Sequence, residues 1–222
     1  MDDAERSGMG SHDRIERMNL RSLAVFGLSW ARVLIVIGIT SVILAVCVSG
    51  LVSSQRASNE RNASTALKTL ESAEADFRAT DRDGNHVNDF WTGDVSGLYY
   101  VKSADLKLEI RLIEESLANA DSKPLFPLTT RGSRKGYSFL ALDRDESVAG
   151  AAGEYKVDTD HSGRKVHNAS MFGFCAFPES DWAGAYQFKV NENNTIFREP
   201  PAKPRNTFPS DEELKRYWSD MD

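Results

Sequence analysis

A run of twenty residues with no charge and no proline, Val33 to Val52, constrains the fold of this chain more than any other feature. The run reads VLIVIGITSVILAVCVSGLV and lies between Arg32 and the polar segment Ser53 to Arg56. As an α-helix it would span about 30 Å, the thickness of the hydrocarbon core of a bilayer. A buried helix of a globular protein normally has a polar face, whereas this run offers only three hydroxyl groups. The run therefore predicts a transmembrane helix at residues 33–52.

The length of the run favours an uncleaved anchor, because the apolar core of a cleavable signal peptide has about 7 to 15 residues. Two alternatives stay open. VSG at residues 48–50 is an acceptable cleavage site, and LAVC at residues 44–47 is similar to a lipoprotein processing site except for the bulky Val46. A slight excess of arginine before the run predicts a cytoplasmic amino-terminal segment, residues 1–32, in a single-pass protein of the bacterial cytoplasmic membrane. The carboxy-terminal part would then be periplasmic or otherwise extracytoplasmic.

Beyond the run, apolar residues recur at steps of three and four, which is typical of an amphipathic helix. These residues are Ala63, Ala66, Leu67, Leu70, Ala73 and Phe77. Charged residues such as Lys68, Glu74 and Arg78 fill the other faces. We expect the transmembrane helix to continue as an amphipathic helix over residues 53–79. A break near residues 50–54, giving two separate helices, is the alternative.

The stretch TDRDGNHVNDFW, residues 80–91, must end that helix, because Gly84 and Asn85 accept a positive φ. It also resembles a short calcium loop, since hard cations take six to eight oxygen ligands and alternating carboxylates around a glycine present several on one side. The candidate calcium ligands are Asp81, Asp83, Asn85 and Asp89. A complete twelve-residue loop ending in a glutamate is absent. The stretch therefore has two interpretations, a polar turn packed by Phe90 and Trp91 or a calcium site.

The remainder of the chain predicts an α+β domain at residues 80–200, followed by a tail at residues 201–222. Five short segments rich in aromatic and β-branched residues are expected to be strands of a small antiparallel sheet: 97–101, 136–142, 171–177, 185–190 and 195–199. The last two flank NENN, a hairpin turn. Residues 105–120 place Leu106, Ile110, Ile113 and Leu117 on one face of an expected helix. A short helix in the tail has Ser210 as its candidate N-cap.

The net charge of −6 and the absence of a basic stripe argue against nucleic acid as a partner. Of the two cysteines, Cys47 lies in the apolar run, so Cys175 has no disulfide partner in the soluble part and is expected to be a small buried residue. The candidate general bases are His86, His161 and His167, and the candidate nucleophiles are Ser162, Ser170 and Cys175. None lies in a recognisable catalytic motif, so we expect no enzymatic activity and no cofactor other than calcium.

Two parts of the chain resemble bacterial type IV pilins and type II secretion pseudopilins, in particular an uncharacterised subgroup of pseudopilin-like, membrane-anchored proteins. The first part is ALKTLESAEADFRATDRDGNHVNDFWTGDVSGLYY, and the second comprises GYSFLAL, FGFCAFPES and AYQFKVNENNTIF. Together they lie within about residues 66–197. The resemblance implies a long helix that leads into a small antiparallel sheet, and a structural or interaction role with the membrane and other secretion or pilus-like components as partners.

The chain departs from the pilin pattern where pilin precursors are processed. Those precursors are cut after a glycine that an aromatic residue follows, and a glutamate at the fifth mature position pairs with a neighbour's amine. Here Gly27 is followed by Leu28, and Arg32 stands fifth. A cation would repel the amine at a depth where an unpaired charge costs several kcal/mol. We therefore expect a protein that does not polymerise by the pilin mechanism, with a calcium-dependent or ligand-sensing binding domain as the alternative function.

Overall fold

The structure, a computed structural model, describes residues 12–103, 108–128, 130–200 and 206–220, with the side chains of residues 12–29 and of Asp220 left out. The chain divides into two compact units, Met1–Val52 and Ser53–Asp222. Some expectations lie outside the described residues. These are the first eleven residues of the amino-terminal segment, Leu106 of the expected helix, and residues 201–205 and 221–222 of the tail.

Helix α1 runs from His12 to Thr80 without interruption at residues 50–54, so the alternative of two separate helices is wrong. The large apolar side chains of α1 from Val33 to Leu51 are not covered by other residues. Their exposed fractions range from 45% for Val33 to 70% for Leu51. An 18-residue window in this helix has a mean hydropathy of 2.7 and no buried residue. Among the described residues, α1 is the one helix that is long and apolar enough to cross a membrane.

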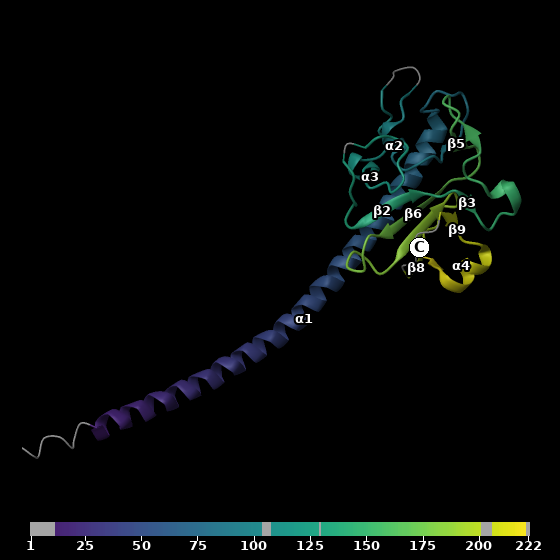
Figure 1. The fold of residues 1–222 in the computed structure, drawn as a ribbon. Helices are drawn as coiled ribbons and strands as arrows, with labels where there is room; N and C mark the ends of the chain where they lie inside the picture. Colours follow the sequence, from purple (N-terminus) through teal and green to yellow (C-terminus); the bar gives the residue numbers. More distant parts are fainter. Residues whose placement is uncertain (1–11, 104–107, 129, 201–205, 221–222) are drawn as a thin grey trace, which may run out of the picture. The chain divides into compact units, whose positions relative to one another are not determined.

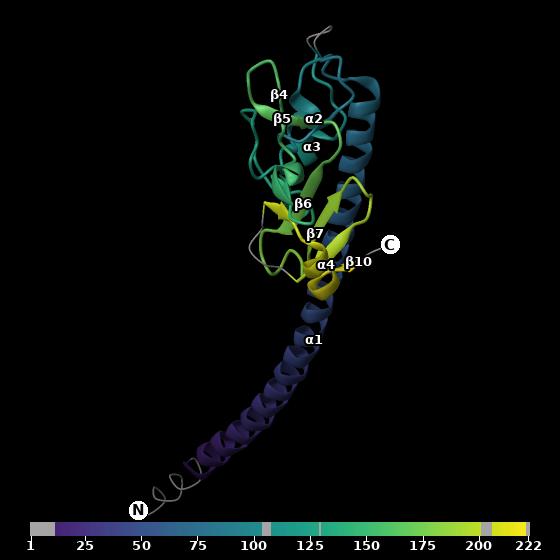
Figure 2. The same cartoon turned by 90° about the vertical axis from the view of Figure 1, so that its right-hand side faces the viewer.

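The last part of α1 is amphipathic, as the sequence predicts. All six apolar residues at steps of three and four are at most 4% exposed: Ala63, Ala66, Leu67, Leu70, Ala73 and Phe77. Figure 2 shows this part of α1 along one side of the folded unit. The expectation for Glu74 is wrong, since its side chain is fully buried. Glu74 is seven residues after Leu67 and therefore lies on the apolar face, not on a solvated one.

The main sheet is five-stranded and antiparallel, in the order β10-β8-β7-β6-β2 (Figure 1). Its strands are β2 Tyr137–Ala141, β6 Gly173–Pro178, β7 Gln187–Asn191, β8 Phe197–Glu199 and β10 Ser219–Asp220. Phe174 and Ala176 of β6 pack in the main core with α1, while the intervening Cys175 joins a smaller cluster on the other face. This alternation follows from the two-residue repeat of a strand, and it confirms Cys175 as a buried residue.

Two smaller sheets complete the folded unit. One has the order β1-β5-β4 and contains β1 Phe90–Trp91, β5 Lys165–Asn168 and β4 Asp158–Thr159. The other pairs β3 Arg144–Asp145 in parallel with β9 Thr207–Phe208, and a 3₁₀ turn, η1, spans Gly150–Gly153. The first of these sheets positions the candidate site, because β1 follows the acidic stretch directly and β5 lies beside it.

Two expectations about secondary structure are wrong. Residues 97–100 form a short helix, α2 Gly97–Tyr100, instead of a strand. The expected helix at 105–120 is reduced, within the described residues, to α3 Glu115–Ala118. Residues 108–114 are not helical and pair with α2 and the residue after it, since Ile110 N donates to Val101 O at 2.8 Å and Leu112 N donates to Leu98 O at 2.9 Å. Ile113 and Leu117 still reach the core, Ile113 from a bend and Leu117 from α3.

The hairpin and the carboxy-terminal helix are confirmed. Strands β7 and β8 pair antiparallel across the NENN turn, where Asn194 has a φ of 66° and its N–H donates to Asn191 O at 3.0 Å. Helix α4 spans Asp211–Tyr217, and the Ser210 hydroxyl accepts from Glu213 N at 3.4 Å. The N-cap and the acidic first turn of α4 are therefore those that the sequence indicates.

Candidate functional site

The acidic stretch forms a turn that ends α1 and leads into β1. Three of its residues have a positive φ: Asp81 at 46°, Gly84 at 68° and His86 at 65°. The Asp81 carboxylate accepts from His86 N at 3.0 Å, and Asn85 Oδ1 accepts from Val87 N at 2.7 Å. These side chains thus replace helical hydrogen bonds that the backbone loses at the helix end. The interpretation of the stretch as a polar turn is confirmed.

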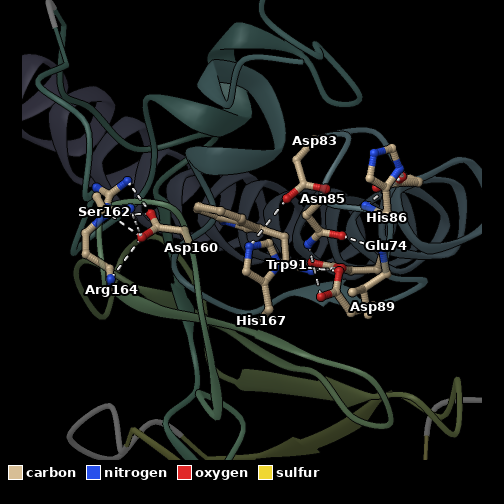
Figure 3. Close-up of polar contacts among 12 residues, drawn as sticks. Glu74, Asp83, Asn85, His86, Asp89, Trp91, Asp160, Ser162, Arg164 and His167 are labelled. Atoms are coloured by element: carbon tan, nitrogen blue, oxygen red, sulfur yellow. Dashed lines mark hydrogen bonds and ion pairs between the residues drawn. The ribbon is translucent and has the colours of Figure 1, made fainter. Parts of the chain in front are cut away.

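The turn places two of the predicted ligands on opposite sides of one histidine. In the pairing of β1 with β5, Trp91 is opposite His167. The His167 ring lies between Asp83 and Asp89 (Figure 3), with Nε2 3.5 Å from Asp83 Oδ2 and Nδ1 3.4 Å from Asp89 Oδ1. The side chains of His167 and Asp89 are only 2% and 3% exposed, and that of Asp83 is 12% exposed. A buried imidazole between two carboxylates is the centre of the candidate site.

Glu74 extends this cluster into the core. Its Oε2 accepts from Trp91 N at 2.9 Å, which ties α1 to β1. Burial raises the pKa of Glu74 well above its ordinary value. The hydrogen bond from Trp91 opposes this effect, and the charge of Asp89 adds to it. A buried carboxyl with a raised pKa holds its proton at a pH at which an exposed glutamate is ionised.

The pKa of His167 is also raised, for a different reason. Burial alone acts to lower it, but the contact with Asp89 and the charges of Asp89 and Asp83 outweigh burial. Burial likewise raises the pKa of Asp83, although the charge of His167 acts to lower it. The electrostatics therefore favour an imidazolium that is attracted to both aspartates.

Several oxygens of the cluster are buried and accept no hydrogen bond from the described residues. They are Glu74 Oε1, Asp81 Oδ1, Asp83 Oδ1 and Asp89 Oδ1. The other oxygen of Asp89 accepts from Asn85 Nδ2 at 3.3 Å. Within the described ranges, no group of three or more histidine, cysteine, aspartate or glutamate side chains is arranged to hold a metal ion. Calcium binding by Asp81, Asp83, Asn85 and Asp89 therefore stays a prediction.

A pocket of about 470 Å³ opens beside the imidazole. Its aromatic wall consists of Trp91, Tyr100 and Phe126, and its charged lining includes Asp83, Arg164 and His167. The Arg164 guanidinium lies 5.5 Å from the centre of the Phe126 ring and 2.8 Å from Asp160 Oδ2. Volume and lining are those of a small-ligand site, in which a few polar groups are set in apolar walls.

Other candidate general bases and nucleophiles lie away from His167 or at the edge of the pocket. His86 is 94% exposed and 3.7 Å from Asp81 Oδ2, outside the pocket lining. His161 and Ser162 line the pocket on the loop before β5. Cys175 is fully buried in the main sheet, and burial raises the pKa of its thiol to about 12, so it is not a thiolate nucleophile.

Glu74 and Trp91 belong to the site but are not among the site residues that the sequence predicts. Leu67, Leu70, Glu74 and Phe77 follow one another at steps of three, four and three. A glutamate in that series signals a buried carboxyl on the core face. The pairing that brings His167 to Asp83 and Asp89 has no local signal, because it depends on a contact between β1 and β5.

Comparisons with family models, with curated proteins and with solved structures find no match to this chain. The resemblance to pilins and pseudopilins therefore stays a prediction that rests on the motifs in the sequence. The apolar helix and the site around His167 are the two features of the chain that bear on its function.

Proposed function

We propose that this chain is a single-pass, membrane-anchored protein of the pseudopilin-like type, which displays the unit Ser53–Asp222 outside the bacterial cytoplasmic membrane as a structural or interaction domain. One observation carries the proposal: the apolar run of α1 has no buried residue in its most apolar window. A soluble protein rarely exposes an apolar patch larger than a few hundred Å². Lipid is the simplest cover for a surface of this length and composition.

The folded unit supports the second half of the proposal, because it has its own core. The buried apolar residues of α1 from Ala63 to Phe77 join the main sheet in one cluster, without any contribution from residues 30–52. The core of this unit is therefore complete without the apolar run. Arg32 stands where assembling pilins have a glutamate, so we propose display of a single domain in place of polymerisation by the pilin mechanism.

Protease added to spheroplasts tests this proposal. We expect it to digest the chain after Ser53 and to spare an epitope tag at the amino terminus, because the small arginine excess lies before the apolar run. The amino-terminal tag should be digested once the cells are lysed. Alkaline carbonate should leave the undigested chain in the membrane pellet. A protected carboxy-terminal unit would reverse the orientation, and release by carbonate would contradict the anchor.

A second candidate function is binding of a small ligand or of calcium beside His167. It is favoured by the pocket of about 470 Å³ and by the buried carboxylate oxygens that accept no hydrogen bond from the described residues. A binding site commonly combines an apolar cavity with side chains of perturbed pKa, as this one does. The calcium form of this hypothesis is the more easily tested.

For calcium, we expect the midpoint of thermal unfolding of the full chain in nanodiscs to rise by less than about a degree between chelator and millimolar calcium. His167 already provides the positive charge between Asp83 and Asp89, and Asp81 and Asn85 each accept from a backbone amide. Calcium at a hundred times its dissociation constant would instead add about 2.7 kcal/mol, a shift of several degrees. Such a shift in the wild type, and its loss in Asp83→Asn, would establish the calcium site.

A further inference from the structure

Among the described residues of the folded unit, Trp182 has the most exposed large apolar side chain, at 70%. It lies in the loop between β6 and β7. Trp91, in the same unit, is 2% exposed. Burying a tryptophan side chain stabilises it by a few kcal/mol. An exposed tryptophan therefore indicates a surface that lipid or another molecule covers.

The loop that carries Trp182 is firmly attached to α1. Asn59, only 7% exposed, donates from Nδ2 to Ala183 O at 2.9 Å. The Glu60 carboxylate accepts from Ala185 N at 2.8 Å. Gly184 packs on the Tyr137 hydroxyl so closely that a Cβ would overlap it. The three residues that follow Trp182 are thus held at a defined place on the unit.

That place is the start of the unit, directly after the apolar run. The Arg56 guanidinium lies 5.8 Å from the centre of the Trp182 ring. Arg56 is four residues after Val52, so the chain keeps it within about 14 Å of the end of the run, however the two units are placed. The headgroup layer on each side of the hydrocarbon core is about 5 to 8 Å thick. The backbone of Arg56 can therefore lie in that layer, with the Trp182 ring beside its guanidinium.

We propose that Trp182 and Arg56 form an interfacial anchor, in which the indole inserts at the boundary between headgroups and acyl chains of the bilayer that holds residues 33–52. The inference rests on the proposed membrane anchor. Tryptophan concentrates at this boundary because its ring is apolar and its N–H remains hydrogen-bonded, and arginine extends its charged end to the same level. The neighbouring Asp181 is exposed and keeps the loop at headgroup depth, since a carboxylate is costly in hydrocarbon. Two points of attachment would restrict the swing of the unit relative to the membrane.

Fluorine NMR on the full chain in nanodiscs, with one chain per disc, tests the proposal. The four tryptophans, Trp30, Trp91, Trp182 and Trp218, are labelled as 5-fluorotryptophan, and the signal of Trp182 is assigned by its loss in Trp182→Phe. Lipids that carry a nitroxide on the headgroup should broaden the Trp182 signal at least threefold more than the signal of the buried Trp91. Arg56→Ser should reduce that difference at least twofold. Trp182→Phe should leave the unfolding midpoint within about 2 °C, because the side chain has little contact in the folded unit.

The broadening of Trp30, which lies just before the apolar run, separates the two proposals. If neither Trp30 nor Trp182 is broadened, the membrane anchor itself is wrong. If Trp30 is broadened while Trp182 resembles Trp91, the anchor stands and the interfacial role of Trp182 is overturned. If Trp182 changes only when two chains share a disc, the loop contacts a second copy of the chain, and the lipid proposal is likewise overturned.

Discussion

Replacing Asp94 by alanine is expected to lower the free energy of unfolding by about 4 kcal/mol, because four hydrogen bonds converge on this buried carboxylate. Asp94 is 1% exposed. It accepts from Trp91 Nε1 at 3.0 Å, from Gly97 N at 2.9 Å, from Leu125 N at 2.6 Å and from the Ser96 hydroxyl. Alanine would leave Gly97 N, Leu125 N and the Ser96 hydroxyl without this acceptor, while Trp91 Nε1 would keep its bond to Asp94 O at 3.0 Å. Each unpaired buried donor costs about 1 to 3 kcal/mol.

The measurement is urea unfolding of the full chain in nanodiscs, followed by tryptophan fluorescence. Asp94→Asn should lose about half as much as Asp94→Ala, because an amide keeps one of the two acceptor oxygens. Asp158→Ala is the matched control, since Asp158 is an exposed aspartate and surface changes of this kind stay within about 0.5 kcal/mol. A loss below about 1 kcal/mol in Asp94→Ala would show that water replaces the carboxylate.

Asp94 also explains why residues 97–100 are not a strand. Glycine followed by leucine, two tyrosines and valine is typical of a strand by composition. However, Asp94 accepts from Gly97 N, and Asp121 accepts from Ser96 N at 2.8 Å, which fixes a helical turn at this point. The contact with Asp121 is distant in sequence, so no local pattern could reveal it. Tertiary hydrogen bonds overrode β propensity here.

The parts of the fold that the sequence predicts correctly are those with long or strictly repeating patterns. The apolar run and the apolar steps from Ala63 to Phe77 extend over several helical turns, and α1 covers both. The strands of the main sheet alternate between two buried clusters, and a recognisable turn joins β7 to β8. The apolar residues at steps of three and four from Leu106 to Leu117 predict a helix, yet Ile110 N and Leu112 N donate to Val101 O and Leu98 O, a pairing between two separate segments. Four apolar residues are too few to decide between the two periods.

The candidate site was predictable only in part. Asp83, Asn85 and Asp89 stand out because acidic and amide residues surround a glycine, and two of them do line the cluster. The cation that they face is an imidazole brought by β5, which the sequence could not place. The site thus depends on strand pairing between β1 and β5. The pKa of His167 depends on its burial and on the neighbouring aspartates.

The folded unit should become less stable as pH rises from about 4 to about 6, through Asp121. Burial and the nearby charge of Asp94 raise the pKa of Asp121 to about 6, although hydrogen bonds from Ser96 and Lys123 oppose the shift. In the unfolded chain an aspartate has a pKa of about 3.9. Between these values the folded state holds a proton that the unfolded state has released, so rising pH favours unfolding. The full effect is about 2 to 3 kcal/mol, and it stays constant above the folded pKa.

The test compares urea unfolding of the wild type and of Asp121→Asn in nanodiscs at several pH values from 4 to 7. The difference between the two free energies of unfolding should fall by about 2 to 3 kcal/mol over this range, because the amide does not titrate. Asp160→Asn is the control, because its difference from the wild type should change little between pH 4 and 7. Although slight burial acts to raise the pKa of Asp160, hydrogen bonds from Ser162 and Arg164 lower it to about 2. That aspartate therefore stabilises the fold above pH 4, and its contribution is lost as pH falls toward 2. If the difference between wild type and Asp121→Asn does not change with pH, Asp121 titrates alike in both states, and the effect of burial and of Asp94 on its pKa is overturned.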